Sequence, residues 1–341
     1  MKVAINGFGR IGRMVLRAYV ERVAKGETLP FEIIAINDLA PSDINAHLLK
    51  YDSVHGTMTE DVSANDHTLH IKGKKTLSLT VLKESNPENL PWKDLGVDVV
   101  FECSGRFTSG DTAKAHLNAG ARKVIISAPG TDVDATIVYG VNHETLTKDH
   151  HIISNASCTT NCLAPVAKVL HESFSIEQGY MTTIHSYTAD QRLVDSFHQD
   201  LYRARAAAMS LIPTTTGAAK AVGFVLPELK GKLDGTAIRV PTPNVSLIDF
   251  KFTTHKDLSK EVINHAMTSA SENELKGVLA VNNIPLVSID FQSNPHSSIF
   301  DLSQTQVIGN RFGRVLSWYD NEWGFSNRML DLTSHIAFYN F

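Results

Sequence analysis

The chain has 341 residues, of which 43% are hydrophobic and 20% are charged, and these proportions are typical of globular proteins with a substantial core. Its net charge is −4 and it has no basic block, which argues against nucleic acid and against an anionic membrane as partners. Three cysteines are too few for a disulfide framework, and the sequence shows neither a signal peptide nor a run of about 18 apolar residues, so we expect a cytoplasmic protein.

A glycine-rich loop follows the first predicted strand. Residues 2–5 have a buried-strand pattern, Gly7, Gly9 and Gly12 then form G-x-G-x-x-G, and apolar residues recur at helical spacing after the loop. Strand, glycine loop and helix in this order are typical of a dinucleotide site, where the glycines let the backbone approach a pyrophosphate at the start of the helix. The segment favours a bound dinucleotide over an ordinary α/β turn.

A second strand over residues 31–36 leads to Asp38. An acidic side chain at this point can bind the ribose hydroxyls of NAD and repel the extra phosphate of NADP, so we expect NAD as the cofactor. Further strands are predicted over residues 97–101 and 123–128 with a helix between them, and this alternation indicates a parallel, doubly wound sheet. Ser127, near the end of its strand, either lies close to the cofactor or is an ordinary loop residue.

Cys158 stands where a predicted strand leads into a helix. Ser157 is the predicted N-cap, so Cys158 falls in the first helical turn, where unpaired backbone N–H groups and the helix dipole stabilise a thiolate nucleophile. The alternative for Cys158 is a small buried apolar residue. Cys162 is predicted to be structural because the dipole effect fades beyond the first turn. Since Cys103 is isolated, no zinc-type spacing exists and we expect no metal.

Candidate partners of this cysteine follow in the next part of the chain. A predicted strand ends at His185, and histidine is the usual base for a catalytic thiol, although a surface histidine fits the position equally well. Residues 187–211 form a long irregular segment, which in a compact domain is usually functional. Its Arg203 and Arg205 are candidate anion clamps or solvated charges. Residues 213–217 stand at the start of another helix. They form either a second phosphate-binding site or only a cluster of residues that cap the helix.

The second half of the chain is α+β in type. Strands are predicted over residues 233–254, with a break at 241–243, and over residues 286–291, 304–308 and 314–319. Helices are predicted over residues 259–269 and from residue 322 onward. This pattern indicates a mostly antiparallel sheet with helices on one side. The length of the chain is consistent with two domains.

Six motifs spread over nearly the whole chain are specific when they are taken together. They are INGFGRIGR at residues 5–13, NASCTTNCL at 155–163, HSYT at 185–188, PTTTGAAK at 213–220, RVPTPNV at 239–245 and WYDNEWG at 318–324. Through them the chain resembles the phosphorylating (type I) glyceraldehyde-3-phosphate dehydrogenase family. The resemblance implies an α/β protein with a Rossmann-type NAD-binding domain at residues 1–157, joined by the C-terminal helix 322–341. It implies an α+β catalytic domain with a mostly antiparallel sheet at residues 158–321.

The resemblance also implies a covalent mechanism. Cys158 attacks the aldehyde of glyceraldehyde 3-phosphate to form a thiohemiacetal, with His185 as the base and later as the acid. Hydride passes to the nicotinamide of NAD and leaves a thioester, which inorganic phosphate converts to the acyl phosphate 1,3-bisphosphoglycerate. The backbone N–H of Cys158 helps to hold the developing oxyanion.

The other site residues are implied by their matches to the family motifs. The family residues that bind the substrate phosphate correspond to Thr188, Asp190 and Arg239. Those that bind the attacking phosphate correspond to Ser157, Thr159, Arg205, Thr216 and Gly217. Those that contact the cofactor correspond to Gly7, Gly9, Arg10, Ile11, Asp38, Ser127 and Asn321. The family is usually a homotetramer, in which the long loop, here near residues 187–211, packs by a neighbour's cofactor site.

Two features bear on the choice of cofactor and substrate. NAD-specific members often carry Leu-Pro where Ser196 and Phe197 follow Asp195 here, which leaves the strictness of NAD over NADP open. Erythrose-4-phosphate dehydrogenase shares the cysteine signature but typically replaces the Tyr-Thr and Thr-Thr-Gly motifs. This chain keeps both, at residues 187–188 and 216–217, so we favour glyceraldehyde 3-phosphate and keep erythrose 4-phosphate as the alternative substrate.

Two further functions belong to different classes. A non-enzymatic binding role needs neither Cys158 nor His185. A non-phosphorylating aldehyde dehydrogenase needs a base that activates water against the thioester, and the sequence offers no residue for that task.

Overall fold

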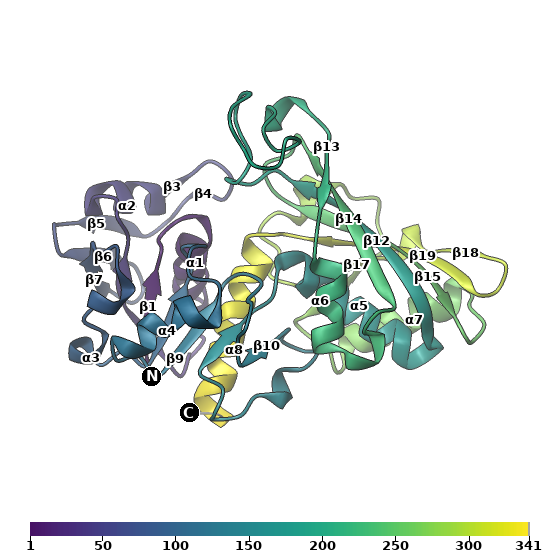
Figure 1. Cartoon of the computed structure of the whole chain (residues 1–341), viewed down its shortest axis with the longest axis horizontal. Coiled ribbons are helices and arrows are strands. Elements are labelled where there is room, and N and C mark those ends of the chain that lie inside the picture. Colours follow the sequence, from purple (N-terminus) through teal and green to yellow (C-terminus); the bar gives the residue numbers. More distant parts are fainter. Residues whose placement is uncertain (340–341) are drawn as a thin grey trace. The chain divides into compact units, whose positions relative to one another are not determined.

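A computed structural model describes residues 1–339 (Figure 1). The chain divides into two compact units. The first comprises Met1–Tyr139, His143–Ala156 and the residues from Ser326 onward, and the second comprises Gly140–Asn142 and Ser157–Phe325. Within residues 1–339, no helix combines the length and the apolar character that crossing a membrane requires.

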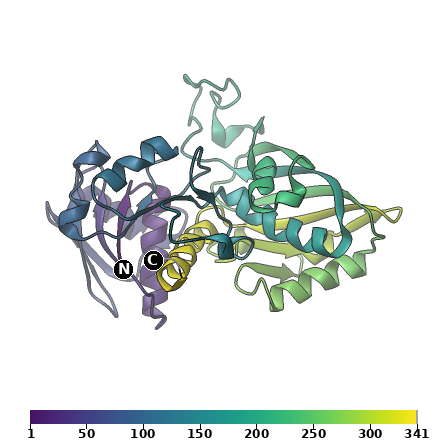
Figure 2. The same cartoon turned by 60° about the horizontal axis from the view of Figure 1, so that its bottom comes forward.

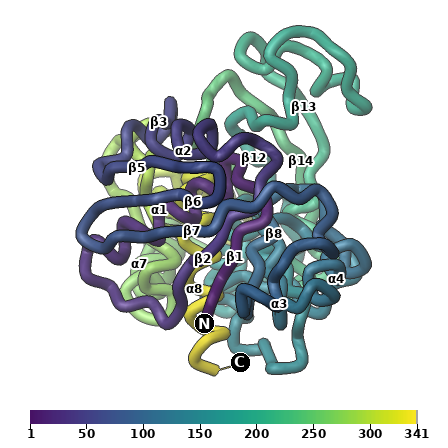
Figure 3. Tube along the Cα trace, turned by 90° about the vertical axis from the view of Figure 1, so that its left-hand side faces the viewer, coloured from purple at the N-terminus to yellow at the C-terminus, as the bar shows by residue number. Residues whose placement is uncertain are grey.

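The first unit is built on a nine-stranded sheet in the order β10-β11-β9-β8-β1-β2-β7-β6-β5. Its strands are β1 (Lys2–Asn6), β2 (Glu32–Asn37), β5 (Asp61–Ala64), β6 (Thr68–Lys72), β7 (Leu77–Leu82), β8 (Val99–Glu102), β9 (Lys123–Ile126), β10 (Ala135–Thr136) and β11 (Ile152–Ser154). In this order, neighbouring strands from β10 through β7 pair in parallel. Strands β6 and β5 extend the sheet in antiparallel pairs. Figure 3 shows β8, β1, β2 and β7 side by side. The predicted Rossmann-type parallel sheet is confirmed.

The helices of the first unit lie in the connections between its strands, except for the C-terminal helix, which follows the last strand of the chain. They are α1 (Arg10–Ala24), α2 (Ser42–Lys50), α3 (Trp92–Leu95), α4 (Gly110–Asn118), most of α8 (Trp323–Tyr339), and the short 3-10 helices η1 (Pro87–Asn89) and η2 (His143–Thr145). The unit also contains a small hairpin of β3 (Tyr51–Asp52) and β4 (Gly56–Thr57). Arg22 of α1 donates hydrogen bonds to Asp331 (2.6 Å) and Asn327 (3.0 Å) of α8. These bonds fasten the C-terminal helix to a unit whose other elements come from the start of the chain.

The second unit holds an eight-stranded sheet in the order β13-β14-β12-β15-β19-β17-β16, with β18 beside β19. Its strands are β12 (Ile176–Ser186), β13 (Ile212–Thr215), β14 (Leu233–Val240), β15 (Ser246–Thr254), β16 (Leu279–Asn282), β17 (Ser298–Asp301), β18 (Gln306–Ile308) and β19 (Phe312–Tyr319). Only the pairs β12–β14 and β16–β17 are parallel, so the predicted, mostly antiparallel sheet is confirmed.

One layer of helices covers this second sheet. It contains α5 (Cys158–Phe174), α6 (Ala218–Val225) and α7 (Lys260–Glu272), and the short helices η3 (Ala207–Met209), η4 (Pro227–Leu229), η5 (Ser288–Phe291) and η6 (Leu302–Gln304) lie in connections. Because α5 packs against both α6 and α7 and against four strands of the sheet, it is the central helix of the layer. Between β12 and β13 the chain makes the long irregular excursion that the sequence predicts near residues 187–211 (Figure 2).

The strand predicted over residues 286–291 is wrong, because the chain forms the helix η5 there. The carboxylate of Asp290 accepts a hydrogen bond from the N–H of Val287 (2.9 Å), and the N–H of Asp290 donates to the carbonyl of Val287 (3.0 Å). These local bonds close a turn in a segment whose alternating apolar residues indicate an extended chain. The prediction also lacks the four-residue strands β16 and β17.

Candidate active site

Cys158 is the first residue of α5, at a turn that connects β11 to this helix. Ser157 caps the helix, since its Oγ accepts a hydrogen bond from the N–H of Thr160 (3.0 Å), as the sequence predicts. Ala156 has φ = 55°, a left-handed conformation that costs a non-glycine residue about 1 kcal/mol. The turn therefore places the cysteine where the helix dipole is strongest.

His185 faces the thiol from the end of β12. Its Nε2 lies 3.5 Å from the Sγ of Cys158. The Nδ1 of the same ring lies 2.7 Å from the carbonyl oxygen of Ser186, and because a carbonyl can only accept, Nδ1 carries the proton. The lone pair of Nε2 is thereby directed at the thiol, which is the arrangement of a general base and its nucleophile.

Arg239 stands beside this histidine on the neighbouring strand β14, where it pairs in register with His185. Its Nη1 donates to the carbonyl of Ser186 (3.0 Å) and to the Oγ1 of Thr188 (3.3 Å). Nη1 also lies 3.1 Å from the Nδ1 of His185, but both atoms carry hydrogen, so this is a contact and not a hydrogen bond. The Nε of Arg239 is buried and has no hydrogen-bond partner among residues 1–339, so it is available to an anion.

Burial and charge set the protonation states of Cys158 and His185. Burial raises the pKa of the Cys158 thiol, and the positive charge of Arg239 is the largest effect that opposes this rise. Burial and then the charge of Arg239 lower the pKa of His185 to about 3. The imidazole is therefore neutral at pH 7 and can accept a proton from the thiol.

Tyr319 is a buried neighbour that the sequence reasoning did not single out. Its ring packs at 5.9 Å from that of His185, and its Oη lies 2.8 Å from the Oγ1 of Thr159 and 2.9 Å from the Oγ1 of Thr183. The contact ties α5, β12 and β19 together under the thiol–imidazole pair. The signs of Tyr319 in the sequence are its place in the WYDNEWG motif and at the end of the strand predicted over residues 314–319.

The other cysteine of α5 lies in a different environment. Cys162 is fully buried, and its Sγ lies 3.4 Å from the Oγ of Ser298. Burial raises the pKa of its thiol to about 12. Burial raises the pKa of Cys158 as well, but the groups of residues 1–339 that act on Cys162 include no positive charge like that of Arg239. The sulfur of Cys162 contacts Ser298 and Ser317 where that of Cys158 contacts His185, which agrees with the structural role predicted for Cys162.

Several residues matched to the attacking phosphate gather where two helices begin. The Oγ1 of Thr160 binds the Oγ of Ser157 (2.8 Å) and donates to the carbonyl of Ala218 (3.2 Å), so the first turns of α5 and α6 lie side by side. Gly217 is the N-cap of α6 and provides no side-chain cap, and the Oγ1 of Thr216 accepts from the N–H of Ala218 (3.1 Å). Two helix N-termini at one place favour a bound anion.

Arg205 is not brought to these groups, and Asp190, which is matched to the substrate phosphate with Thr188 and Arg239, forms ion pairs elsewhere although its charge acts on Arg239. The Nε of Arg205 donates to the Oδ2 of Asp195 (2.7 Å), and Asp190 pairs with Arg203 (2.5 Å) and His198 (3.4 Å). All five lie within the 187–211 segment. Within residues 1–339, no hydrogen bond or ion pair joins Arg205 to Ser157, Thr159 or Thr216, although all four are matched to the same phosphate.

The first unit contains a groove of about 270 Å³ at the carboxyl ends of β1, β2 and β8. It is lined by Asn6, Gly7, Gly9, Asn37, Asp38, Leu39, Glu84, Ser85, Cys103, Ser104, Arg106 and Phe107. Gly7 has φ = 91°, and a Cβ there would lie 2.4 Å from the backbone N of Ser104, so only glycine fits. A Cβ on Gly9, the N-cap of α1, would have no atom within 4 Å. The open approach to this helix start fits a dinucleotide pyrophosphate.

The remaining residues matched to the cofactor lie in both units. In the first unit, the Oδ2 of Asp38 accepts from the N–H of Phe8 (2.7 Å), and Arg10, which adjoins Ile11 at the start of α1, is paired with Asp52. Ser127 directly follows β9 and donates its N–H to the carbonyl of Glu102 (3.0 Å). In the second unit, the Oδ1 of Asn321 accepts from the hydroxyls of Ser186 and Ser246 (2.9 Å each), which orients its amide NH₂ as a donor.

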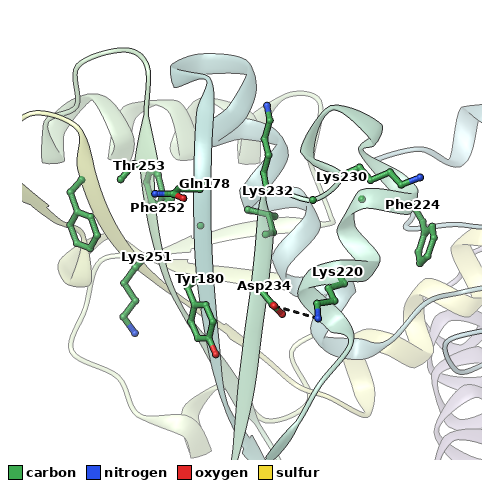
Figure 4. A pocket seen from close by; sticks show the side chains of 15 residues that line it. Gln178, Tyr180, Lys220, Phe224, Lys230, Lys232, Asp234, Lys251, Phe252 and Thr253 are labelled. Carbon is green, nitrogen blue, oxygen red and sulfur yellow. Dashed lines mark ion pairs between the residues drawn. The ribbon is translucent and has the colours of Figure 1, made fainter.

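A second hollow, of about 670 Å³, lies on the sheet of the second unit (Figure 4). Its lining includes the ion pair Lys220–Asp234 (3.3 Å) and aromatic side chains such as Tyr180 and Phe224. Neither a cysteine nor a histidine lines it, so it offers no thiol chemistry. In the described part of the chain, no three His, Cys, Asp or Glu side chains are grouped so that they could hold a metal ion.

Both units of the chain match known proteins of one family. Residues 1–110 match the family profile of the glyceraldehyde 3-phosphate dehydrogenase NAD binding domain, and residues 157–321 match that of its C-terminal domain. A glyceraldehyde-3-phosphate dehydrogenase of Xanthobacter flavus is 60% identical over 97% of each chain. Those of Pseudomonas aeruginosa and Geobacillus stearothermophilus are 56% and 55% identical over 99% of this chain and 98% of theirs. The chain therefore belongs to the glyceraldehyde-3-phosphate dehydrogenase family and is an NAD-dependent oxidoreductase.

Proposed function

We propose that the chain oxidises D-glyceraldehyde 3-phosphate with NAD and inorganic phosphate to 1,3-bisphosphoglycerate, a step of glycolysis and gluconeogenesis. Residues 1–157 and the C-terminal helix bind NAD in this proposal, and residues 158–321 carry the chemistry. The observation that carries it is the distance of 3.5 Å between the Sγ of Cys158 and the Nε2 of His185 at the start of a helix.

The proposed reaction begins when the sulfur of Cys158 attacks the aldehyde carbon and His185 takes the thiol proton. The backbone N–H of Cys158, in the first turn of α5, donates to the oxygen that becomes negatively charged. NAD, when bound, accepts the hydride of the resulting thiohemiacetal, so the sulfur is left in a thioester. Inorganic phosphate then attacks the acyl carbon, the C–S bond breaks, and His185 returns the proton to the departing sulfur.

Two anion seats are part of the proposal. Thr188 and Arg239 are joined by a hydrogen bond of 3.3 Å, and the unpartnered Nε of Arg239 supports a role in holding the substrate phosphate, to which we also assign Asp190. The paired starts of α5 and α6 support an attacking-phosphate seat at Ser157, Thr159, Thr216 and Gly217. Arg205 joins that seat in this proposal after it releases Asp195.

A requirement for inorganic phosphate is the test of this function. We expect sustained NADH formation from glyceraldehyde 3-phosphate and NAD when phosphate or arsenate is present, and a single burst without either, because the thioester then has no acceptor. Absorbance of NADH measures both. Sustained turnover without phosphate would mean that water resolves the thioester and would overturn the phosphate seat. If erythrose 4-phosphate gives the higher kcat/KM, the alternative substrate replaces glyceraldehyde 3-phosphate.

We also propose a homotetramer in the cytoplasm. Seven apolar side chains in the 187–211 segment are each at least 61% exposed, which suits a surface covered by a second copy of the chain. They are Leu193, Val194, Phe197, Leu201, Tyr202, Met209 and Leu211. All three cysteines are free, which suits a reducing compartment.

Sedimentation velocity tests the tetramer. We expect the mass of four chains for the wild type and a smaller species for the double variant Leu193→Glu/Met209→Glu, because each change puts a charge into an apolar contact. Phe338→Glu alters an apolar residue that is 68% exposed on α8 and is the matched control, expected to leave the mass unchanged. A monomeric wild type would contradict the proposal.

A further inference from the structure

A buried carboxylate lies beneath the groove of the first unit. Glu102 ends β8, and its side chain has no exposed surface. A carboxylate that is buried without hydrogen-bond donors destabilises a protein, so the donors around Glu102 indicate what it holds in place. Its Oε1 accepts from the N–H (2.7 Å) and the Oγ (2.5 Å) of Ser104, and its Oε2 accepts from the Nδ2 of Asn6 (2.6 Å) and the Nε2 of His116 (3.0 Å).

The proton positions on His116 follow from Trp92. The indole Nε1 of Trp92 donates to the Nδ1 of His116 (3.0 Å), and an indole nitrogen can only donate. Nδ1 is therefore the acceptor, and the proton of the neutral imidazole is on Nε2, directed at Glu102. Both side chains are fully buried, so water cannot replace either bond. The histidine acts as a fixed donor to the carboxylate.

The other donors of Glu102, Asn6 at the end of β1 and Ser104 after β8, line the groove. Ser104 receives a hydrogen bond at its Oγ from the N–H of Arg106 (3.1 Å), so its own hydroxyl hydrogen goes to Glu102. Asn6 accepts at its Oδ1 from the Nδ2 of Asn37 (2.7 Å), so its Nδ2 is also committed to Glu102. Ser104, Asn6, Asn37 and Arg106 all line the groove. One carboxylate thus connects the ends of β1, β2 and β8.

Gly7 makes this connection sensitive to small movements. Its α-carbon packs so closely against Ser104 that no Cβ fits between them, and its N–H donates to the carbonyl of Asn37 (2.8 Å). A shift of Ser104 or Asn37 therefore moves the glycine loop. His116 adds a second link, because its ring packs edge-on at 6.2 Å from Phe107, which also lines the groove.

We propose that Glu102, held by His116, is a positioning residue for the NAD groove. Its carboxylate fixes the loops after β1, β2 and β8 in the conformation that receives the adenosine and pyrophosphate part of the dinucleotide. Glu102 and His116 act through these loops, since the groove lining contains neither of them. The consequence is a role in cofactor affinity and not in the chemical step at Cys158.

Glu102→Gln is the sharpest variant because it keeps the shape and changes only the acceptor pattern. All four partners are donors, so in either orientation the NH₂ of the glutamine meets a donor. We expect the dissociation constants of NAD and of ADP-ribose, measured by calorimetry without aldehyde or phosphate, to rise at least about tenfold. The KM for NAD rises in parallel, while kcat at saturating NAD changes less than the affinity.

His116 provides a second pair of variants if Glu102→Gln folds poorly. His116→Leu removes the donor to Glu102 and is expected to weaken NAD binding about tenfold. His116→Gln can still accept from Trp92 and donate to Glu102, so it is expected to recover most of that affinity. Rescue by glutamine distinguishes positioning by a hydrogen bond from simple filling of the core.

Val124→Ala is the matched control for loss of stability. Val124 is a fully buried residue of β9 that packs in a cluster with Ala113 of α4, and the cluster contains no member of the Glu102 network. We expect it to lower the melting temperature without changing the dissociation constant of NAD. If Glu102→Gln and His116→Leu weaken NAD binding no more than Val124→Ala does, the network is merely structural and the proposal is overturned. Because no substrate is present, this outcome is independent of the proposed reaction.

Discussion

Cys158→Ser is expected to lower kcat for glyceraldehyde 3-phosphate oxidation by roughly 10⁴-fold, a magnitude typical of the loss of a covalent nucleophile. A serine hydroxyl is far harder to deprotonate than a thiol, and the neutral imidazole of His185, 3.5 Å from the sulfur, cannot make up the difference. Steady-state NADH formation measures the loss. The burst of NADH without phosphate is expected to vanish as well, because no thioester forms.

Cys162→Ser is the matched control, since the same change is made one helical turn deeper. The Sγ of Cys162 already contacts the hydroxyl of Ser298, so serine suits the polar side of its site, and kcat is expected to stay within about threefold of the wild type. Calorimetric NAD binding by Cys158→Ser checks that the first unit remains intact. A Cys158→Ser enzyme with more than about a tenth of wild-type kcat would contradict a nucleophilic role and would favour a binding function of the chain.

Local features of the site could be predicted because neighbouring residues determine them. Ser157 as the N-cap follows from a hydroxyl before a helical apolar stripe, and the structure confirms its bond to the N–H of Thr160. The glycine loop between β1 and α1 follows from the same kind of pattern, and the φ of 91° at Gly7 gives it a steric reason. The alternation of strands and helices was sufficient to predict a parallel sheet in the first unit.

Long-range features were beyond this reasoning. The register of β12 against β14 brings His185 to Arg239 across 54 residues of sequence, and no local pattern encodes that register. Tyr319 contacts Thr159 from 160 residues away, so its burial beneath the site is a result of tertiary packing. The role of Glu102 could not be predicted either, because it depends on four hydrogen-bond donors from three separate segments of the chain. The false strand at residues 286–291 shows that a side-chain cap can override an alternating pattern.

Arg239→Leu is expected to have the second-largest effect, and it acts on two quantities. The KM for glyceraldehyde 3-phosphate is expected to rise about hundredfold, because the substrate phosphate loses charge-assisted hydrogen bonds, each of which contributes about 1.5–3 kcal/mol. The positive charge of Arg239 also lowers the pKa of Cys158, so its removal raises that pKa. The pH profile of Cys158 alkylation by iodoacetamide is therefore expected to move to higher pH. Steady-state kinetics and the alkylation rate measure the two effects separately.

Arg239→Lys separates the charge from the shape of the side chain. Lysine keeps the positive charge but cannot reproduce the bonds that the guanidinium donates to Ser186 and Thr188, so it cannot hold a phosphate in the same bidentate manner. We therefore expect an alkylation profile close to that of the wild type together with a raised KM. If Arg239→Lys shifts the alkylation profile as far as Arg239→Leu does, the charge is not what favours the thiolate. If neither variant raises the KM, the substrate phosphate is bound elsewhere, and Arg239 acts only on the thiol–imidazole pair.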